Sequence, residues 1–222
     1  MTDTTLPAAP SAAMNYFEQY GSTASMTMIT GTLIKFSKGD WLMGQEEEEV
    51  KEGRKFTCVM DDLQIGWTRW QDNKPTAQHM GKIVEGFTPP RREALGDDDK
   101  TLWDTDAQGQ ERDPWQFTNS VIMRNPGTSG AEETDLFTFS TSSRGGINAV
   151  GDLCKAYVRM AREQGDGYPI VELTSSSYKH PNPEYGRIKK PVFKIVGWEK
   201  KVIEAAPKAL EEPKPKAKAK GK

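Results

Sequence analysis

The chain has 222 residues, 35% of them hydrophobic, and a formal net charge of −2 at pH 7. This length suits one medium domain with tails, and no apolar run approaches the roughly 18 residues of a membrane helix. The N-terminus lacks a basic segment followed by an apolar one, so we expect neither secretion nor membrane insertion. Cys58 and Cys154 stand far apart in apolar surroundings, which predicts two buried thiols in a reducing compartment.

Short apolar segments with a period of two, rich in β-branched and aromatic residues, predict strands through most of the chain. Clusters of Gly, Pro, Asn and Asp separate them. In chain order the predicted strand segments are 26–36, 54–70, 80–87, 115–123 and 135–141, followed after a helix by Tyr168 to Leu173 and Pro191 to Trp198.

The stretch INAVGDLCKAYVRMAREQG, residues 147–165, predicts the helix. Its apolar residues recur at helical spacing, and the stretch ends at Gly165. Asn148 or Ser143 is expected to cap its start.

This order predicts a mainly β fold with one long helix, of the α+β class. An oligonucleotide-binding (OB) barrel has five strands and a helix between the third and fourth, so we expect an OB-like barrel with extra hairpins and disordered tails. Other small barrels and α+β sheets fit the same order. The expected domains are a flexible N-terminal segment (1–24), an OB-like β-rich domain (25–203) and a disordered Lys/Pro/Ala-rich tail (204–222).

Positive charge is concentrated near the C-terminus. From Lys179 onward there are 13 Lys or Arg against five Glu, a net charge of +8, so the preceding 178 residues carry −10. Such asymmetry is typical of a polyanion contact or of a solubilising tail.

The stretch Thr174 to Trp198 combines cations with aromatic rings in a segment predicted to be a polar loop between the last two strands. Cations suit phosphates and exposed rings suit bases, so we predict a nucleic-acid surface here. An ordinary solvated loop is the alternative. The candidate residues are Tyr178, Lys179, His180, Tyr185, Arg187, Lys189 and Lys190.

A second candidate lies in GWTRW, where Trp67 and Trp70 are three residues apart and therefore point to opposite faces of a strand. One of them is expected at a rim, where with Arg69 it would make a stacking platform. The alternative is a tryptophan packed beneath a loop.

A third candidate, Arg144, stands between a run of hydroxyl residues and Gly145 at the predicted helix start. Free amides there favour a backbone phosphate, although Ser followed by Gly is also ordinary capping chemistry.

Catalytic and metal sites find little support. His79 and His180 are the only histidines and form no metal motif, and no nucleophile elbow or CxxC accompanies them. Asp104, Asp106 and Gly109 imitate the start of a calcium loop, but Trp115 stands where the bidentate Glu belongs. We expect no enzyme, no metal and no cofactor.

The motifs LIKFSKGDWLMG, GW-x-RW, DPWQ and YGRIKKPVFKIVGW, which span residues 31–198, are similar to those of small phage and prophage-encoded proteins. The resemblance implies a phage replication or recombination setting in the bacterial cytoplasm, where OB-fold single-stranded DNA-binding proteins are common. Such proteins tend to end in an acidic tail, whereas this chain ends in PKPKAKAKGK.

Two functions therefore stay open. The first is a noncatalytic single-stranded DNA-binding protein that uses ring stacking and a basic groove with little sequence preference. Replication or recombination proteins and further copies of the chain would be its other partners, with no membrane. The second is a phage structural or assembly protein.

Overall fold

The computed structural model describes residues 29–105, 109–130, 132–179 and 186–201. The predicted terminal segments, 1–24 and 204–222, lie outside the described residues. The strands are β1 (Thr32–Ser37), β2 (Asp40–Met43), β3 (Glu48–Glu49), β4 (Lys55–Cys58), β5 (Gln64–Gln71), β6 (Lys74–Lys82), β7 (Trp115–Arg124), β8 (Leu136–Thr141), β9 (Gly167–Lys179) and β10 (Arg187–Lys200). The helix α2 spans Arg144–Gln164, and short 3-10 turns span Met60–Asp62, Ile83–Glu85, Arg92–Leu95, Lys100–Leu102 and Glu133–Asp135.

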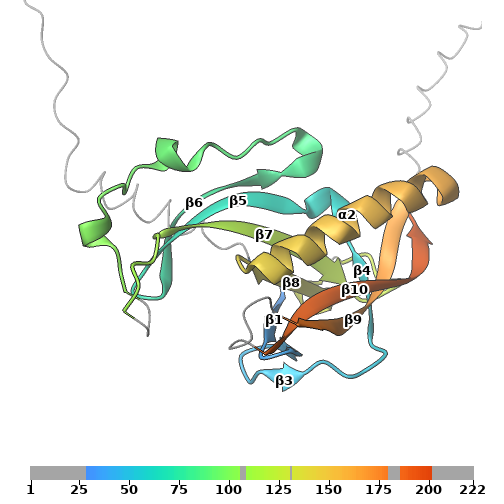
Figure 1. Ribbon diagram of the computed structural model, residues 1–222. Helices are drawn as coiled ribbons and strands as arrows, with labels where there is room; N and C mark the ends of the chain where they lie inside the picture. The colour runs from blue at the N-terminus through green and yellow to red at the C-terminus, as the bar shows by residue number, and fades with distance from the viewer. Residues whose placement is uncertain (1–28, 106–108, 131, 180–185, 202–222) are drawn as a thin grey trace, which may run out of the picture.

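The strands form one curled sheet in the order β10-β9-β4-β7-β8-β1-β2-β3, to which the β5–β6 hairpin is joined through β7 (Figure 1). Neighbouring strands are antiparallel except β1 and β8, which run parallel. The curl brings β2 back to β9, where the Trp41 indole nitrogen donates a 2.7 Å hydrogen bond to the Thr174 carbonyl. The prediction of a mainly β, barrel-like α+β fold with one helix is therefore confirmed for the described residues.

The helix packs across the sheet and closes the core on that side (Figure 1). Its apolar stripe buries Ala149, Val150 and Leu153 against the sheet. The Ser143 hydroxyl accepts a 3.1 Å hydrogen bond from the Gly146 amide, so Ser143 is the cap and Asn148 lies inside the helix. The helix ends before Gly165, as its sequence predicts.

An aromatic cluster fills the strand side of the core. The Trp41 ring lies 5.0 to 5.6 Å from the rings of Phe36, Phe139 and Phe193, in tilted or edge-on geometry. Aromatic pairs of this kind stabilise a core beyond their buried area. Because these rings come from β1, β2, β8 and β10, they hold the curl of the sheet.

A polar cluster fastens the end of β10 to the middle of the sheet. Glu199 accepts hydrogen bonds from the Thr57 hydroxyl (2.6 Å), the Arg124 guanidinium (2.8 Å) and the Gly127 amide (3.3 Å). Partial burial opposes ionisation, but these donors together outweigh it and lower the pKa of Glu199.

Three predictions about strands need correction. Only residues 80–82 of the predicted strand 80–87 belong to a strand, the end of β6, and a 3-10 turn at Ile83–Glu85 follows. Segment 54–70 is two strands, because a 3-10 turn at Met60–Asp62 intervenes and buries Met60 and then Leu63. Among the described residues the first strand begins at Thr32, so residues 29–31 of the predicted segment 26–36 are not in it, and residues 26–28 lie outside the described residues. Gly31 precedes the strand with φ of +71°, a left-handed conformation that breaks an extended strand.

The predicted loop between the last two strands is also wrong over much of its length. Residues 174–179 and 187–190 continue β9 and β10, and they pair in register from Arg187 opposite Lys179 to Lys190 opposite Ser176. These side chains are too polar for a core, but backbone hydrogen bonds pair the strands while the side chains stay largely exposed. Of the two cysteines, Cys58 is buried and Cys154 is only half-buried, and both are free thiols.

Candidate nucleic-acid interface

The outer end of the β9–β10 hairpin forms one side of a hollow of about 520 Å³, which we call the tip groove. The β1–β2 turn and the junction of β8 with α2 form its other sides. Segments far apart in the sequence thus meet here. The lining residues are Phe36, Lys38, Gly39, Ser143, Gly145, Tyr178, Arg187, Ile188, Lys189, Lys190 and Pro191.

The tip groove is positively charged. Lys38, Arg187, Lys189 and Lys190 line it, and none of the lining residues just named is acidic. The Lys189 ammonium lies 3.6 Å from an Asp40 oxygen, but both side chains are about half exposed, and such pairs contribute little. The Arg187 guanidinium donates a 2.9 Å hydrogen bond to the Ser177 hydroxyl, which orients the guanidinium without neutralising it.

The β1–β2 turn supplies a part of the groove that the sequence prediction did not include. Lys38 and Gly39 both have positive φ, as a tight hairpin turn requires. A Cβ on Gly39 would lie 2.0 Å from the Lys189 Cδ, so the glycine allows the lysine stem to pass over the turn. The dipeptide Lys-Gly between two apolar segments could have predicted the turn. Its contact with β10 could not be predicted, because it joins residues far apart in the sequence.

The first turn of α2 opens onto the same groove through Ser143 and Gly145. A Cβ on Gly145 would lie 3.5 Å from the Lys190 Cβ, which places the helix start directly against β10. Unpaired amides and the helix dipole favour anions at such an end. Arg144, predicted from sequence, is exposed between these two residues, although it does not itself line the groove.

Tyr178 adds an aromatic ring to the cations. Its side chain is 45% exposed, and its residue pairs with Ile188 across the hairpin. Lys179 is exposed beside it, opposite Arg187. The other two residues predicted for this stretch, His180 and Tyr185, lie outside the described residues.

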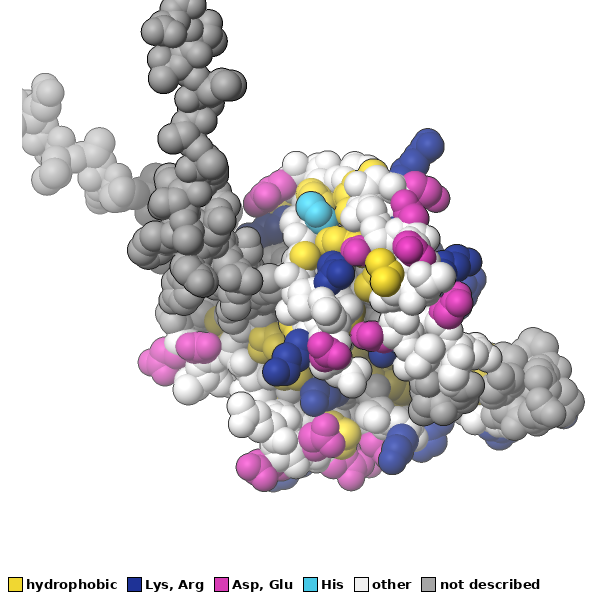
Figure 2. Space-filling model, turned by 90° about the vertical axis from the view of Figure 1, so that its left-hand side faces the viewer, with side chains coloured by type: hydrophobic (Ala, Val, Ile, Leu, Met, Phe, Trp, Pro, Cys, Tyr) yellow, Lys and Arg dark blue, Asp and Glu magenta, His cyan; other side chains and the backbone are white. Residues whose placement is uncertain are grey.

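The β5–β6 hairpin, which carries the other predicted residues, has a different surface. Figure 2 looks onto that end of the molecule, where Lys and Arg are interspersed with Asp and Glu. Mixed charges of this kind offer no extended positive field to a polyanion. The tip groove is therefore the better candidate interface.

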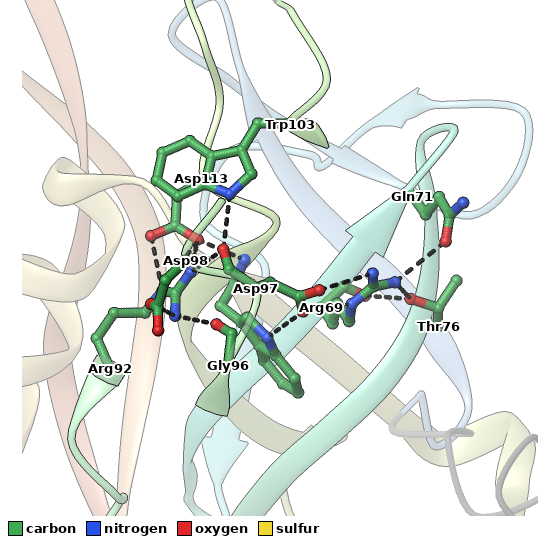
Figure 3. Close-up of polar contacts among 10 residues, drawn as sticks. Arg69, Gln71, Thr76, Arg92, Gly96, Asp97, Asp98, Trp103 and Asp113 are labelled. Atoms are coloured by element: carbon green, nitrogen blue, oxygen red, sulfur yellow. Dashed lines mark hydrogen bonds and ion pairs between the residues drawn. The ribbon is translucent and has the colours of Figure 1, made fainter. Parts of the chain in front are cut away.

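Arg69 is held in a polar network rather than presented to solvent (Figure 3). Its guanidinium donates to both Asp97 oxygens at 2.8 and 3.3 Å, to Gln71 at 3.1 Å and to Thr76 at 3.0 Å. The hydrogen bond from Arg69 is the largest influence on the Asp97 carboxyl and holds its pKa below the usual range. The structure does not bring Arg69 together with the residues of the tip groove.

The same network fastens the long connection between β6 and β7. Arg92 forms a two-pronged ion pair with Asp113, at 2.7 and 2.8 Å, and donates to the Gly96 carbonyl. The indole nitrogens of Trp103 and Trp115 donate to the Asp97 backbone and side chain respectively. These contacts give the network a structural role.

The two tryptophans of GWTRW have different environments. The Trp67 indole nitrogen donates a 2.9 Å hydrogen bond to the Pro90 carbonyl, and its ring packs edge-on against Phe117. Trp67 is thus the tryptophan packed beneath a loop. Trp70 shares a hollow with Thr68, and its indole nitrogen is buried without a hydrogen-bond partner among the described residues.

Comparisons with protein-family models, curated proteins and solved structures find no match to the chain. No helix in the described part of the chain is long and apolar enough to cross a membrane.

Proposed function

We propose that the chain is a noncatalytic single-stranded DNA-binding protein that holds the strand in the tip groove. The observation that carries the proposal is the convergence of Lys38, Arg187, Lys189 and Lys190 with an exposed Tyr178 at a helix start. Cations and helix amides bind phosphates, and an exposed ring stacks on an unpaired base. This is the physical pattern of proteins that bind single strands with little sequence preference.

The charge of the groove sets the expected salt dependence. If each of its four cations contacts one phosphate, the logarithm of the affinity falls with the logarithm of salt at a slope of about 2.8, at 0.7 per contact. Between 50 and 200 mM salt the affinity would fall about 50-fold. Stacking on Tyr178 adds about 1–3 kcal/mol that does not depend on salt.

The shape of the fold fits the proposal. We infer an OB-like barrel, in which the strands after the helix border the ligand-binding surface, as β9 and β10 border the tip groove here. On the resemblance of the sequence motifs to phage proteins, we propose that this activity serves phage replication or recombination in the bacterial cytoplasm.

The test is fluorescence anisotropy with a labelled oligo-dT of about 20 nucleotides over a range of salt. Replacing Lys189 and Lys190 together by Ala should lower the affinity and reduce the salt slope by about 1.4. Tyr178→Ala should weaken binding without changing the slope. Lys194→Ala is the matched control, because Lys194 lies on the same strand, is 61% exposed and pairs with Glu172 outside the groove.

No binding by the folded wild-type protein at low salt would refute the proposal and leave the structural or assembly function. A loss for Lys194→Ala of half the loss for the double lysine variant or more would also contradict it, because the effect would then follow net charge rather than the groove.

A further inference from the structure

A second hollow, of about 280 Å³, lies on the face of the sheet away from the core. We call it the outer hollow. Leu33 and Lys35 line it, whereas Ile34 between them is fully buried in the core, so the hollow is on the opposite face of β1. Residues of β5, β6, β7 and β8 complete it.

Two residues that line the outer hollow have buried polar atoms with no hydrogen-bond partner in the described part of the chain. Thr68 is 2% exposed, and its hydroxyl has no hydrogen-bond partner among the described residues. The same holds for the indole nitrogen of Trp70, two residues along β5. Thr118, which also lines the hollow and is 4% exposed, instead donates a 3.0 Å hydrogen bond to the Gln116 carbonyl.

An unpartnered buried hydroxyl is costly, at about 1–3 kcal/mol, and buried polar groups of folded proteins rarely lack a partner. Because Thr68 lines the outer hollow, its unpartnered hydroxyl indicates a ligand that supplies a hydrogen bond there. The walls include Leu33, Trp70 and Pro75, so the ligand has an apolar body. A flat ring with hydrogen-bonding groups at its edge has both properties.

Residues that follow one another in the chain line the outer hollow and the tip groove. Ser142 lines the hollow and Ser143 lines the groove, and these residues are consecutive at the junction of β8 with α2. Lys35 and Lys38 similarly line the two sites from β1 and the turn that follows it. The end of β1 and the junction of β8 with α2 therefore contribute residues to both sites.

We propose that the outer hollow receives one unpaired base of the strand whose phosphates occupy the tip groove, an inference that rests on the proposed function. Trp70 provides the ring surface for stacking, and the Thr68 hydroxyl bonds the edge of the base. Because every base has a flat face and an edge that bonds a hydroxyl, the site takes any base.

The test compares Thr68→Val with Thr118→Val, two changes of the same size in the same hollow. Each variant is titrated with oligo-dT and with an abasic oligomer that has the same number of phosphates. Thr68→Val should weaken oligo-dT binding about 2- to 12-fold, the value of one hydrogen bond. It should leave the abasic oligomer unaffected, and its thermal midpoint should not fall, because no protein hydrogen bond is lost.

Thr118→Val should lower stability, and it should weaken oligo-dT binding less than Thr68→Val does, because the Thr118 hydroxyl is already donated to the Gln116 carbonyl. Equal oligo-dT affinities for the two variants would overturn the inference, while binding of the abasic oligomer would show that the tip groove still holds phosphates. If neither oligomer binds the wild-type protein, the proposed function itself fails, and the inference fails with it.

A measurement on the wild-type protein needs no substitution. Oligo-dT carrying 5-iodouracil is crosslinked by ultraviolet light, and the attached peptide is identified by mass spectrometry. The inference predicts a crosslink to the peptide that contains Trp70. Crosslinks confined to the peptide of Tyr178 would overturn it, because the bases would then lie in the tip groove alone.

Discussion

Replacing Leu153 by Ala removes part of the contact between the helix and the sheet. Leu153 is 2% exposed and belongs to the core cluster that also contains Val150 and Ala149. The change deletes the equivalent of three buried methylene groups, or about 2.4 kcal/mol at 0.8 each. A cavity term adds to this because the helix cannot collapse fully onto the sheet, which brings the expected cost to about 3–4 kcal/mol, within the usual range of 2–5.

Urea unfolding followed by far-ultraviolet circular dichroism measures this cost, and the thermal midpoint should fall by about 6–16 °C. Val158→Ala is the control on the same helix, because Val158 is 45% exposed and the change should alter stability by less than about 0.5 kcal/mol. A Leu153→Ala variant no less stable than the Val158→Ala variant would refute the packing of α2 described above.

Three further predictions concern stability. Because folding lowers the pKa of Glu199, the ionised carboxylate should contribute fully to stability above about pH 4.5, and this contribution should be lost as the pH falls through the folded pKa. Glu199→Gln should therefore make the thermal midpoint depend less on pH between pH 6 and 3. Gly146→Ala should destabilise the protein by about 1–3 kcal/mol, because the new Cβ would lie 2.1 Å from the Thr141 hydroxyl. Gly151→Ala, with open space around it, should instead stabilise the protein by about 0.5–1 kcal/mol. Urea unfolding midpoints that shift in the same direction for both variants would contradict this. Asp97→Asn should speed proteolytic cleavage between β6 and β7 while the core melts nearly as before, and cleavage at the wild-type rate would show that the network does not fasten that connection.

Local signals were enough for much of the fold. The helix was predictable because Val150 and Leu153 repeat at helical spacing between a serine cap and Gly165. Most strand segments were predictable because their alternation reflects one buried face. The split between β4 and β5 was not, because Met60 and Leu63 are apolar like the strands around them, and only burial shows that a turn places them in the core.

The candidate site was predictable in composition but not in geometry. The cations and tyrosine of the last hairpin stood out in the sequence, yet their extension of β9 and β10 depends on cross-strand pairing. The engagement of Arg69 with Asp97, 28 residues away, could not be deduced from spacing. Lys38 and Thr68 escaped notice because their importance comes from neighbours distant in the chain.

The most direct test of the tip groove is lysine labelling with an amine-reactive reagent, with and without saturating oligo-dT, quantified by mass spectrometry. The proposal predicts that the strand protects Lys38, Lys189 and Lys190. Lys194, 61% exposed on β10, and Lys155, 80% exposed on the helix, should react equally in both samples. Protection spread evenly over all five lysines, or absent from those of the groove while the oligonucleotide is bound, would contradict the account.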